Sequence, residues 1–231
     1  MKFLHANWNN LIFVSYKVDP QILLPFLPNG TELDFHNGNC YVSLVAFMFR
    51  DTRVCNLPIP GHINFEEVNL RLYVKPKYDQ TKRSVVFIKE IVPKKAIELI
   101  ANSLFYENYF TTKMNHEFHD NKYFYSWIDH EIMNTLDFEI TNDFYLPKEG
   151  SLQEFITEHY WGYTKAKENT FEYEVKHAQW EVSDIKSIKL NVNFQNNYGN
   201  EFSFLDHQEP DNICFANGSY VEVNYGKKLK I

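Results

Sequence analysis

The segment FEEVNLRLYV, residues 65–74, shows the clearest structural pattern in the chain. Successive side chains of a β-strand point to opposite faces of a sheet. The aliphatic side chains of this segment share one face: Val68, Leu70, Leu72 and Val74. The other face carries Phe65, Glu67, Asn69, Arg71 and Tyr73. The segment therefore predicts a strand with one core face and one face on which a carboxylate, an amide and a guanidinium lie in a row, about 7 Å apart.

The polar face of this strand has two interpretations. Facing water, it would be a solvated face on which Glu67 and Arg71 form a weak ion pair, worth about 0–1 kcal/mol. Facing the interior of a closed sheet, it would be a ligand site in which Arg71 binds a carboxylate through two hydrogen bonds. Taken alone, the alternation favours the solvated face, and both interpretations stay open at this point.

Strand-like segments rich in β-branched and aromatic residues recur along the whole chain. They lie at residues 11–16, 31–35, 39–49, 65–74, 83–91, 109–114, 122–127, 131–140, 170–176, 187–192 and 220–225. Both faces of the segment 39–49 are largely apolar, as in a strand covered on both sides, and the turn at 36–38 predicts a hairpin with 31–35. Short helices are predicted from Pro20, over 93–105 and over 151–157, with Asp19 and Ser151 as N-caps.

This pattern predicts a β-rich α+β fold with an antiparallel, barrel-like core and flanking short helices. We expect a single domain over residues 1–231, because no linker, repeat or low-complexity tract interrupts the chain. An aromatic content of 17% excludes a disordered chain. The formal charge of -7 argues against nucleic acid as a partner, since phosphate binding needs a basic face.

The chain also lacks several signals of location and chemistry. No run of 18 apolar residues occurs and the N-terminus soon becomes polar, so we expect no membrane association and no secretory signal. The three unclustered cysteines, Cys40, Cys55 and Cys214, fit buried thiols in a reducing cytoplasm. The zinc, phosphate-loop, dinucleotide and nucleophile-elbow motifs are all missing, so the sequence predicts neither a metal site nor a cofactor.

Two aromatic segments add candidate site residues. They are EHYWGY at 158–163, which contains Tyr160, and HAQW at 177–180, which contains His177 and Trp180. Clustered aromatic side chains are most often core, and a pocket wall is the second interpretation. His177 is a candidate general base because the unperturbed pKa of histidine lies near neutrality, although a histidine at a strand end is more often structural.

The chain resembles the YqjF-like family, an uncharacterised group of bacterial proteins, over nearly its whole length. The residues that carry the resemblance are Trp8, Leu11, Pro20, Leu24, Leu27-Pro28, Leu33-Asp34, Gly38, 41–45, Phe47, Arg53, Phe65, Glu67, Asn69-Leu70-Arg71, Tyr73-Val74, 155–160, Tyr163, His177 and Trp180. The resemblance implies the fold of acetoacetate decarboxylase, with a β-barrel-like core and an internal cavity. It also implies that Glu67 matches a cavity glutamate of those enzymes.

The resemblance argues against the decarboxylase reaction itself. Acetoacetate decarboxylases use a Schiff-base lysine from a Pro-Lys-Lys motif that follows the helix. In this chain Tyr109 and Phe110 stand where the two lysines would be. Lys94-Lys95 matches the letters of the motif but precedes the helix. Without the amine, imine-dependent decarboxylation has no electron sink.

Three functional hypotheses follow. In the first, the chain binds a small molecule such as a carboxylate, with polar contacts from Glu67, Asn69 and Arg71 and apolar walls from Tyr109, Phe110, Tyr160 and Trp180. In the second, it is an enzyme that acts on a small oxo- or hydroxy-acid without imine chemistry, with Glu67 or His177 as the acid–base group. In the third, it is a structural or interaction protein whose cavity is filled by its own side chains. The sequence specifies neither the ligand nor the oligomeric state.

Overall fold

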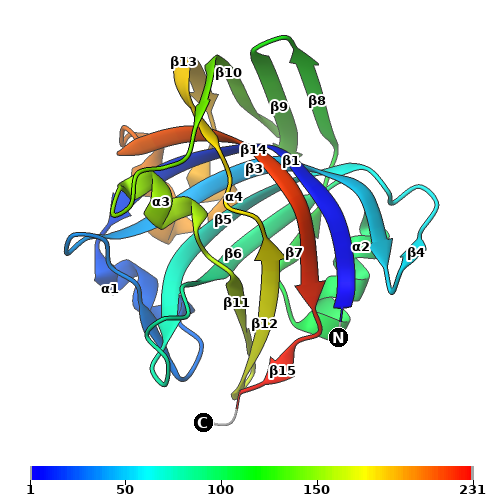
Figure 1. Ribbon diagram of the computed structural model, residues 1–231, viewed down its shortest axis with the longest axis vertical. Helices are drawn as coiled ribbons and strands as arrows, with labels where there is room; N and C mark the ends of the chain where they lie inside the picture. Colours follow the sequence, from blue (N-terminus) through cyan, green and yellow to red (C-terminus); the bar gives the residue numbers. More distant parts are fainter. Residues whose placement is uncertain (1, 230–231) are drawn as a thin grey trace.

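The computed structural model describes residues 2–229 and is built on one large sheet (Figure 1). Seven strands form a closed circuit of pairings: β1 (Lys2–Val18), β3 (Cys40–Val54), β5 (Phe65–Pro76), β6 (Ser84–Val92), β11 (Trp161–Ala166), β12 (Asn169–His177) and β14 (Asn212–Asn224). The pairing of β12 with β14 completes the circuit, and the contact of β6 with β11 is its parallel step. The space enclosed by these seven strands is where a ligand site can form.

The other strands extend the sheet or pair along it. β13 (Val182–Asn191), β10 (Ile132–Tyr145), β9 (Lys122–Asp129) and β8 (Met114–His119) continue the sheet beyond β14. The short strands β2 (Thr31–Leu33), β4 (Leu57–Pro58), β7 (Tyr109–Thr111) and β15 (Lys227–Lys228) pair with β5, β3, β6 and β12 respectively. Most of these pairings are antiparallel.

The helices are short and lie outside the sheet. They are α1 (Pro20–Leu23), which continues into the 3-10 helix η1 (Leu24–Phe26), α2 (Lys95–Ile100), which continues into the π-helical turn η2 (Ala101–Phe105), α3 (Leu152–Thr157), α4 (Phe194–Tyr198) and the 3-10 helix η3 (Asn200–Asp206). The prediction of a β-rich α+β chain with a few short helices is therefore confirmed.

The two faces of the central strands belong to two separate hydrophobic clusters. On β3, Val42, Leu44, Ala46 and Met48 join the larger cluster, which includes residues of β9, β10, α4 and η3. The alternate residues Tyr41, Val45, Phe47 and Phe49 join the second cluster, which includes residues of β12, β14 and α3. The prediction that both faces of 39–49 are covered is confirmed, and the second cluster surrounds the interior of the circuit.

The local sequence signals predicted the two helix N-caps correctly but predicted the wrong partner for the strand at 31–35. The Asp19 side chain accepts a hydrogen bond from the backbone N–H of Gln21 at 2.9 Å, and Ser151 caps α3 through the N–H of Glu154 at 3.2 Å. The predicted hairpin between 31–35 and 39–49 is wrong beyond one bridge, because β2 pairs with β5. The turn signal at 36–38 fixes the reversal of the chain, but the β5 edge supplies the partner.

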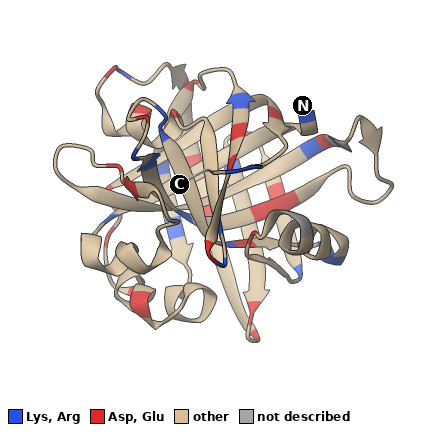
Figure 2. Ribbon diagram, turned by 90° about the horizontal axis from the view of Figure 1, so that it is seen from below, with Lys and Arg blue, Asp and Glu red and all other residues tan. Residues whose placement is uncertain are grey.

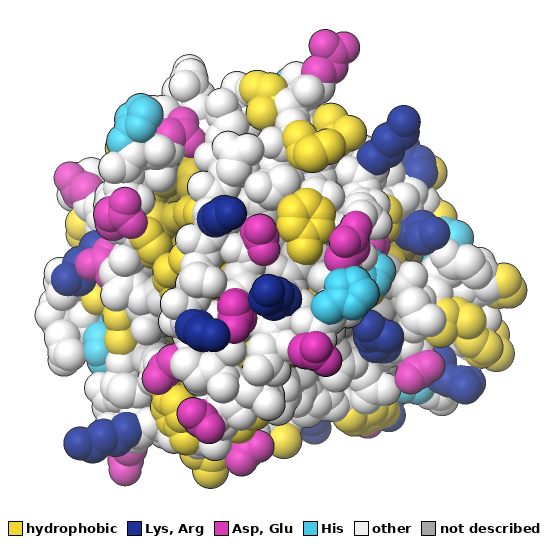
Figure 3. All heavy atoms as spheres, turned by 90° about the horizontal axis from the view of Figure 1, so that it is seen from above, with side chains coloured by type: hydrophobic (Ala, Val, Ile, Leu, Met, Phe, Trp, Pro, Cys, Tyr) yellow, Lys and Arg dark blue, Asp and Glu magenta, His cyan; other side chains and the backbone are white. Residues whose placement is uncertain are grey.

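Acidic and basic residues are mixed along the ribbon in Figure 2, and their side chains are mixed on the face that Figure 3 shows from above. Cys40 and Cys214 are buried and free, as expected, whereas Cys55 is exposed. Among the described residues, every helix is too short or too polar to cross a bilayer.

Gly218 provides a test of the packing between β14 and β1. Its φ of +86° lies in the left-handed region, and an added Cβ would lie 1.8 Å from the carbonyl oxygen of Trp8. We expect Gly218→Ala to lower the free energy of unfolding by about 2–4 kcal/mol. The control Gly61→Ala, at φ +76° with no atom within 4 Å, should cost about 1 kcal/mol. Equal losses in urea denaturation would contradict the proposed clash.

Candidate functional site

The strand register brings three polar residues into one row. Asn69 on β5 pairs with Glu90 on β6, and Glu90 pairs in turn with Tyr109 on β7. Glu67 precedes Asn69 by two positions and so lies on the same face of β5. The sheet thus gathers residues that are up to 42 positions apart in the sequence.

Glu67 is the centre of a small hydrogen-bond network. Its side chain is 2% exposed, so the polar face of β5 is buried and the solvated interpretation is wrong. The amide of Asn69 donates to Glu67 Oε1 at 3.0 Å, and the hydroxyl of Tyr109 donates to Oε2 at 3.1 Å. Burial raises the pKa of Glu67 to about 7, even though these two hydrogen bonds favour the ionised form and lower it.

Two further carboxyls belong to the same group, and we call Glu67, Glu90 and Glu107 the carboxyl triad. Burial raises the pKa of Glu90 well above its usual range, and the nearby charges of Glu107 and Glu67 raise it further. Burial also raises the pKa of Glu107 to about 7, while the hydroxyl of Thr164 donates to Glu107 Oε1 at 2.6 Å. Among the described residues, Glu90 Oε2 is buried without a hydrogen-bond partner.

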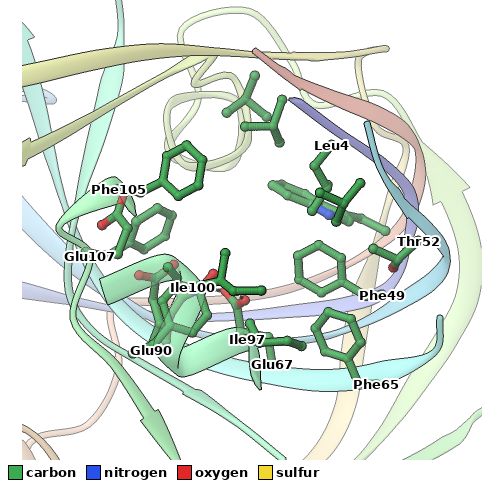
Figure 4. A pocket seen from close by; sticks show the side chains of 18 of the residues that line it. Leu4, Phe49, Thr52, Phe65, Glu67, Glu90, Ile97, Ile100, Phe105 and Glu107 are labelled. Carbon is green, nitrogen blue, oxygen red and sulfur yellow. Dashed lines mark hydrogen bonds between the residues drawn. The ribbon is translucent and has the colours of Figure 1, made fainter. Parts of the chain in front are cut away.

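The triad lines a cavity of about 200 Å³ inside the circuit of strands. Figure 4 shows Glu107, Glu90 and Glu67 along the left and lower part of the cavity, with Leu4, Thr52 and Phe49 on the right and Phe65 close to Glu67. Most of the other lining side chains are apolar, among them Trp8, Leu11, Val45, Phe47, Phe87, Val175 and Val223. Ile97, Ile100 and Phe105, from α2 and η2, border the same space. The cavity therefore combines apolar walls with one acidic side.

Tyr173 completes the acidic side and depends on a glycine. It lies opposite Gly162 in the pairing of β11 with β12. A Cβ at Gly162 would lie 2.2 Å from the Tyr173 ring, so glycine makes room for that ring. Burial and the charges of the triad raise the pKa of Tyr173, and the tyrosine remains a neutral hydrogen-bond donor.

Arg71 also lines the cavity but does not pair with Glu67. Its Nη2 donates to the carbonyl oxygen of Ile156 in α3 at 2.9 Å. The guanidinium carbon lies 5.0 Å from the ring centre of Phe13 and 5.4 Å from that of Tyr73. Arg71 therefore anchors α3 to the sheet, and its contacts differ from those of the carboxyl triad.

Three predicted residues lie away from the cavity and form a stack of their own. The His177 ring lies 4.0 Å from the Trp180 ring and 4.6 Å from the Tyr160 ring, centre to centre. His177 Nδ1 contacts the carbonyl oxygen of Ala178 at 2.8 Å, and Trp180 donates to the Ser219 hydroxyl. Burial lowers the pKa of His177. These rings contact one another and use their polar atoms locally, and none of the three is among the residues that line the cavity.

Phe110 and the segment Pro93-Lys94-Lys95 also lie outside the cavity lining. The Phe110 ring is partly exposed and lies beneath Lys89, whose Nζ is 4.3 Å from its centre. Lys95 is exposed and pairs with Glu98 on the same helix. The lining contains no lysine among the described residues, and neither Lys94 nor Lys95 reaches it. Within residues 2–229, no group of three or more acidic, histidine or cysteine side chains is placed to hold a metal ion.

Sequence reasoning missed Glu90, Glu107 and Tyr173. Glu90 follows Lys89 in the mostly apolar strand SVVFIKEIV, where a buried charge is unusual and could have served as a signal. Glu107 and Tyr173 have polar sequence neighbours, so nothing in the sequence marks them as buried. Only the pairing of distant strands shows that they line the same cavity as Glu67.

The fold has the architecture of acetoacetate decarboxylase. The acetoacetate decarboxylase of Legionella pneumophila superposes with a TM-score of 0.68 at 11% identity, covering 98% of this chain and 87% of that one. An acetoacetate decarboxylase-like enzyme from Sphingomonas wittichii RW1 gives 0.66 at 13% identity, covering 100% and 94%. The enduracididine biosynthesis enzyme MppR, complexed with pyruvate, gives 0.66 at 13% identity, covering 98% and 90%.

The chain belongs to the DUF2071 family of uncharacterized conserved proteins, which matches residues 5–220. The uncharacterized protein YqjF of Bacillus subtilis (strain 168) is 27% identical over 194 residues, covering 82% of this chain and 78% of that protein. The resemblance seen in the sequence is therefore confirmed.

The raised pKa values of Glu67 and Glu107 predict how stability depends on pH. Both groups hold their protons to about pH 7 in the folded chain, against an ordinary value of 4.5. The free energy of unfolding should therefore fall as the pH rises between these values. At pH 8, Glu67→Gln and Glu107→Gln should each raise it by about 1–3 kcal/mol, measured by urea denaturation. The control is Glu149→Gln at an exposed position, which should change the free energy of unfolding little. If the free energy of unfolding of all variants varied with pH as it does in the wild type, the prediction would be contradicted.

Proposed function

We propose that this single-domain protein binds a small molecule inside a barrel-like chamber formed by the circuit of strands. The observation that carries the proposal is the cavity of about 200 Å³, with apolar walls on one side and the carboxyl triad on the other. Ligand sites generally combine apolar walls with a few polar groups that fix the orientation of the ligand. A buried apolar cavity of about 150 Å³ accepts a benzene ring, so this space suits a ligand of about that size.

The arrangement supports binding better than a purely structural role. A self-filled interior predicts that Glu67 and Arg71 pair with each other across packed side chains. Instead, Glu67 accepts from Asn69 and Tyr109, and Arg71 donates to Ile156. Leaving a carboxyl oxygen of Glu90 buried without a donor is costly, and a bound ligand would remove that cost. MppR, which has the same architecture, is complexed with pyruvate, a small molecule.

A neutral ring probe tests the cavity. We expect benzyl alcohol to raise the thermal unfolding midpoint and to bind with a Kd of about 1 mM or tighter, given its eight non-hydrogen atoms. Val223→Phe should abolish the shift, because Val223 lines the cavity and the added ring would occupy it. Leu57→Phe is the matched control, since Leu57 is exposed and lies outside the lining. Equal shifts in both variants would contradict binding at this site.

The raised pKa of Glu67 favours a second candidate function, an enzyme that acts on a small oxo- or hydroxy-acid. A general base works best when its pKa lies near the operating pH, and the pKa of Glu67 is about 7. In this scheme Glu67 removes a proton from the carbon next to the carbonyl group, and Arg71 binds the substrate carboxylate.

Pyruvate in deuterium oxide tests the enzyme hypothesis. If Glu67 is the base, the wild-type protein should exchange the methyl protons of pyruvate, as seen by NMR, and Glu67→Gln should lose at least about 100-fold in rate. Borohydride added with pyruvate should leave the protein mass unchanged, since no lysine is among the described lining residues. A covalent adduct would instead indicate imine chemistry, and exchange that persists in Glu67→Gln would exclude Glu67 as the base.

A further inference from the structure

We propose that the carboxyl triad selects a ligand whose head group is a cationic nitrogen, an ammonium or an amidinium, carried on an apolar body. This inference rests on the proposed ligand-binding function and assigns the chemical class of the ligand. Glu67, Glu90 and Glu107 reach one side of the cavity from β5, β6 and the segment before β7.

The triad has more acceptor oxygens than donors. Asn69 and Tyr109 donate to Glu67, and Thr164 donates to Glu107. Glu90 Oε2 is buried and lacks a donor within the part of the chain that the structure describes. A ligand with several N–H groups would supply what this side of the cavity lacks, because an ammonium group offers three donors and no acceptor.

The cations near the cavity do not neutralise the triad. No salt bridge among the described residues involves any of its three carboxyls. Arg71 is held by Ile156 and by two aromatic rings, and the His62 ring contacts the carbonyl oxygen of Pro60 in the 55–64 loop. The other titratable groups that face the triad are the tyrosines Tyr109 and Tyr173, which are neutral donors. A cationic ligand would therefore pair with the triad in place of the protons that its carboxyls hold.

Electrostatics discriminates between head groups of equal size. When the triad is ionised, a carboxylate placed beside it meets like charges in a site of low dielectric, which is unfavourable. A hydroxyl group supplies one hydrogen bond, whereas a cation forms charge-assisted hydrogen bonds that are about twice as strong. Because the triad holds protons near neutral pH, binding of a cation should release protons, and affinity should rise with pH.

Three probes of matched shape test the inference: benzylamine, benzyl alcohol and benzoate. By isothermal titration calorimetry at neutral pH, we expect benzylamine to bind at least about tenfold more tightly than benzyl alcohol, and benzoate to bind most weakly. Titrations in two buffers with different ionisation enthalpies should show proton release for benzylamine and none for benzyl alcohol.

Isosteric variants locate the selectivity. Glu90→Gln and Glu107→Gln should each weaken benzylamine by about tenfold and leave benzyl alcohol within about threefold. Exposed Glu149→Gln should change neither, and a thermal melt of each variant checks that it is folded. If benzyl alcohol binds as well as benzylamine, or benzoate binds best, the cationic selectivity is wrong and the cavity proposal stands. If none of the three probes binds to the folded wild-type protein, both proposals are overturned.

Discussion

Removing a carboxyl group from water is the constraint on which the interior of this protein depends. A buried carboxyl must find donors, find a cation or retain its proton. The fold provides donors for Glu67 through Asn69 and Tyr109 and for Glu107 through Thr164. Within residues 2–229 no cation forms a salt bridge with these carboxyls, so their raised pKa values express the remaining cost of burial. The interior thus carries a cluster of carboxyl groups that are costly to ionise, and groups with strongly shifted pKa values are often found where a protein binds or reacts with another molecule.

The sheet can hold the three carboxyl groups because one of its faces forms the larger hydrophobic core and the other borders the cavity. One face of β3 and β5 packs against β9, β10, α4 and η3 in the larger hydrophobic cluster. That packing leaves the other face free to border a cavity and to carry polar groups. Short helices complete the interior: Arg71 anchors α3 through Ile156, and side chains of α2 and η2 border the cavity.

The comparison with acetoacetate decarboxylase separates architecture from chemistry. The chains superpose over nearly their full length at about one residue in ten identical, so what they share is the fold. No lysine is among the described lining residues, whereas Tyr109 and the triad are. Because chemistry depends on the side chains of the site, a shared fold does not carry the decarboxylase reaction to this chain.

The sequence by itself determined the strand content, the short helices with their Asp19 and Ser151 caps, and the alternation on 65–74, since these depend on local spacing and hydrogen bonding. It also pointed to Glu67, Asn69 and Tyr109, which line the cavity. It could not decide whether the polar face of β5 meets water, because alternation is the same in an open and a closed sheet. The pairing of β12 with β14, more than 40 residues apart, is what turns that face inward. The same long-range pairings bring Glu90, Glu107 and Tyr173 to Glu67 and leave Phe110, Tyr160, His177 and Trp180 elsewhere, since side-chain neighbours across a sheet are set by register and not by distance along the chain.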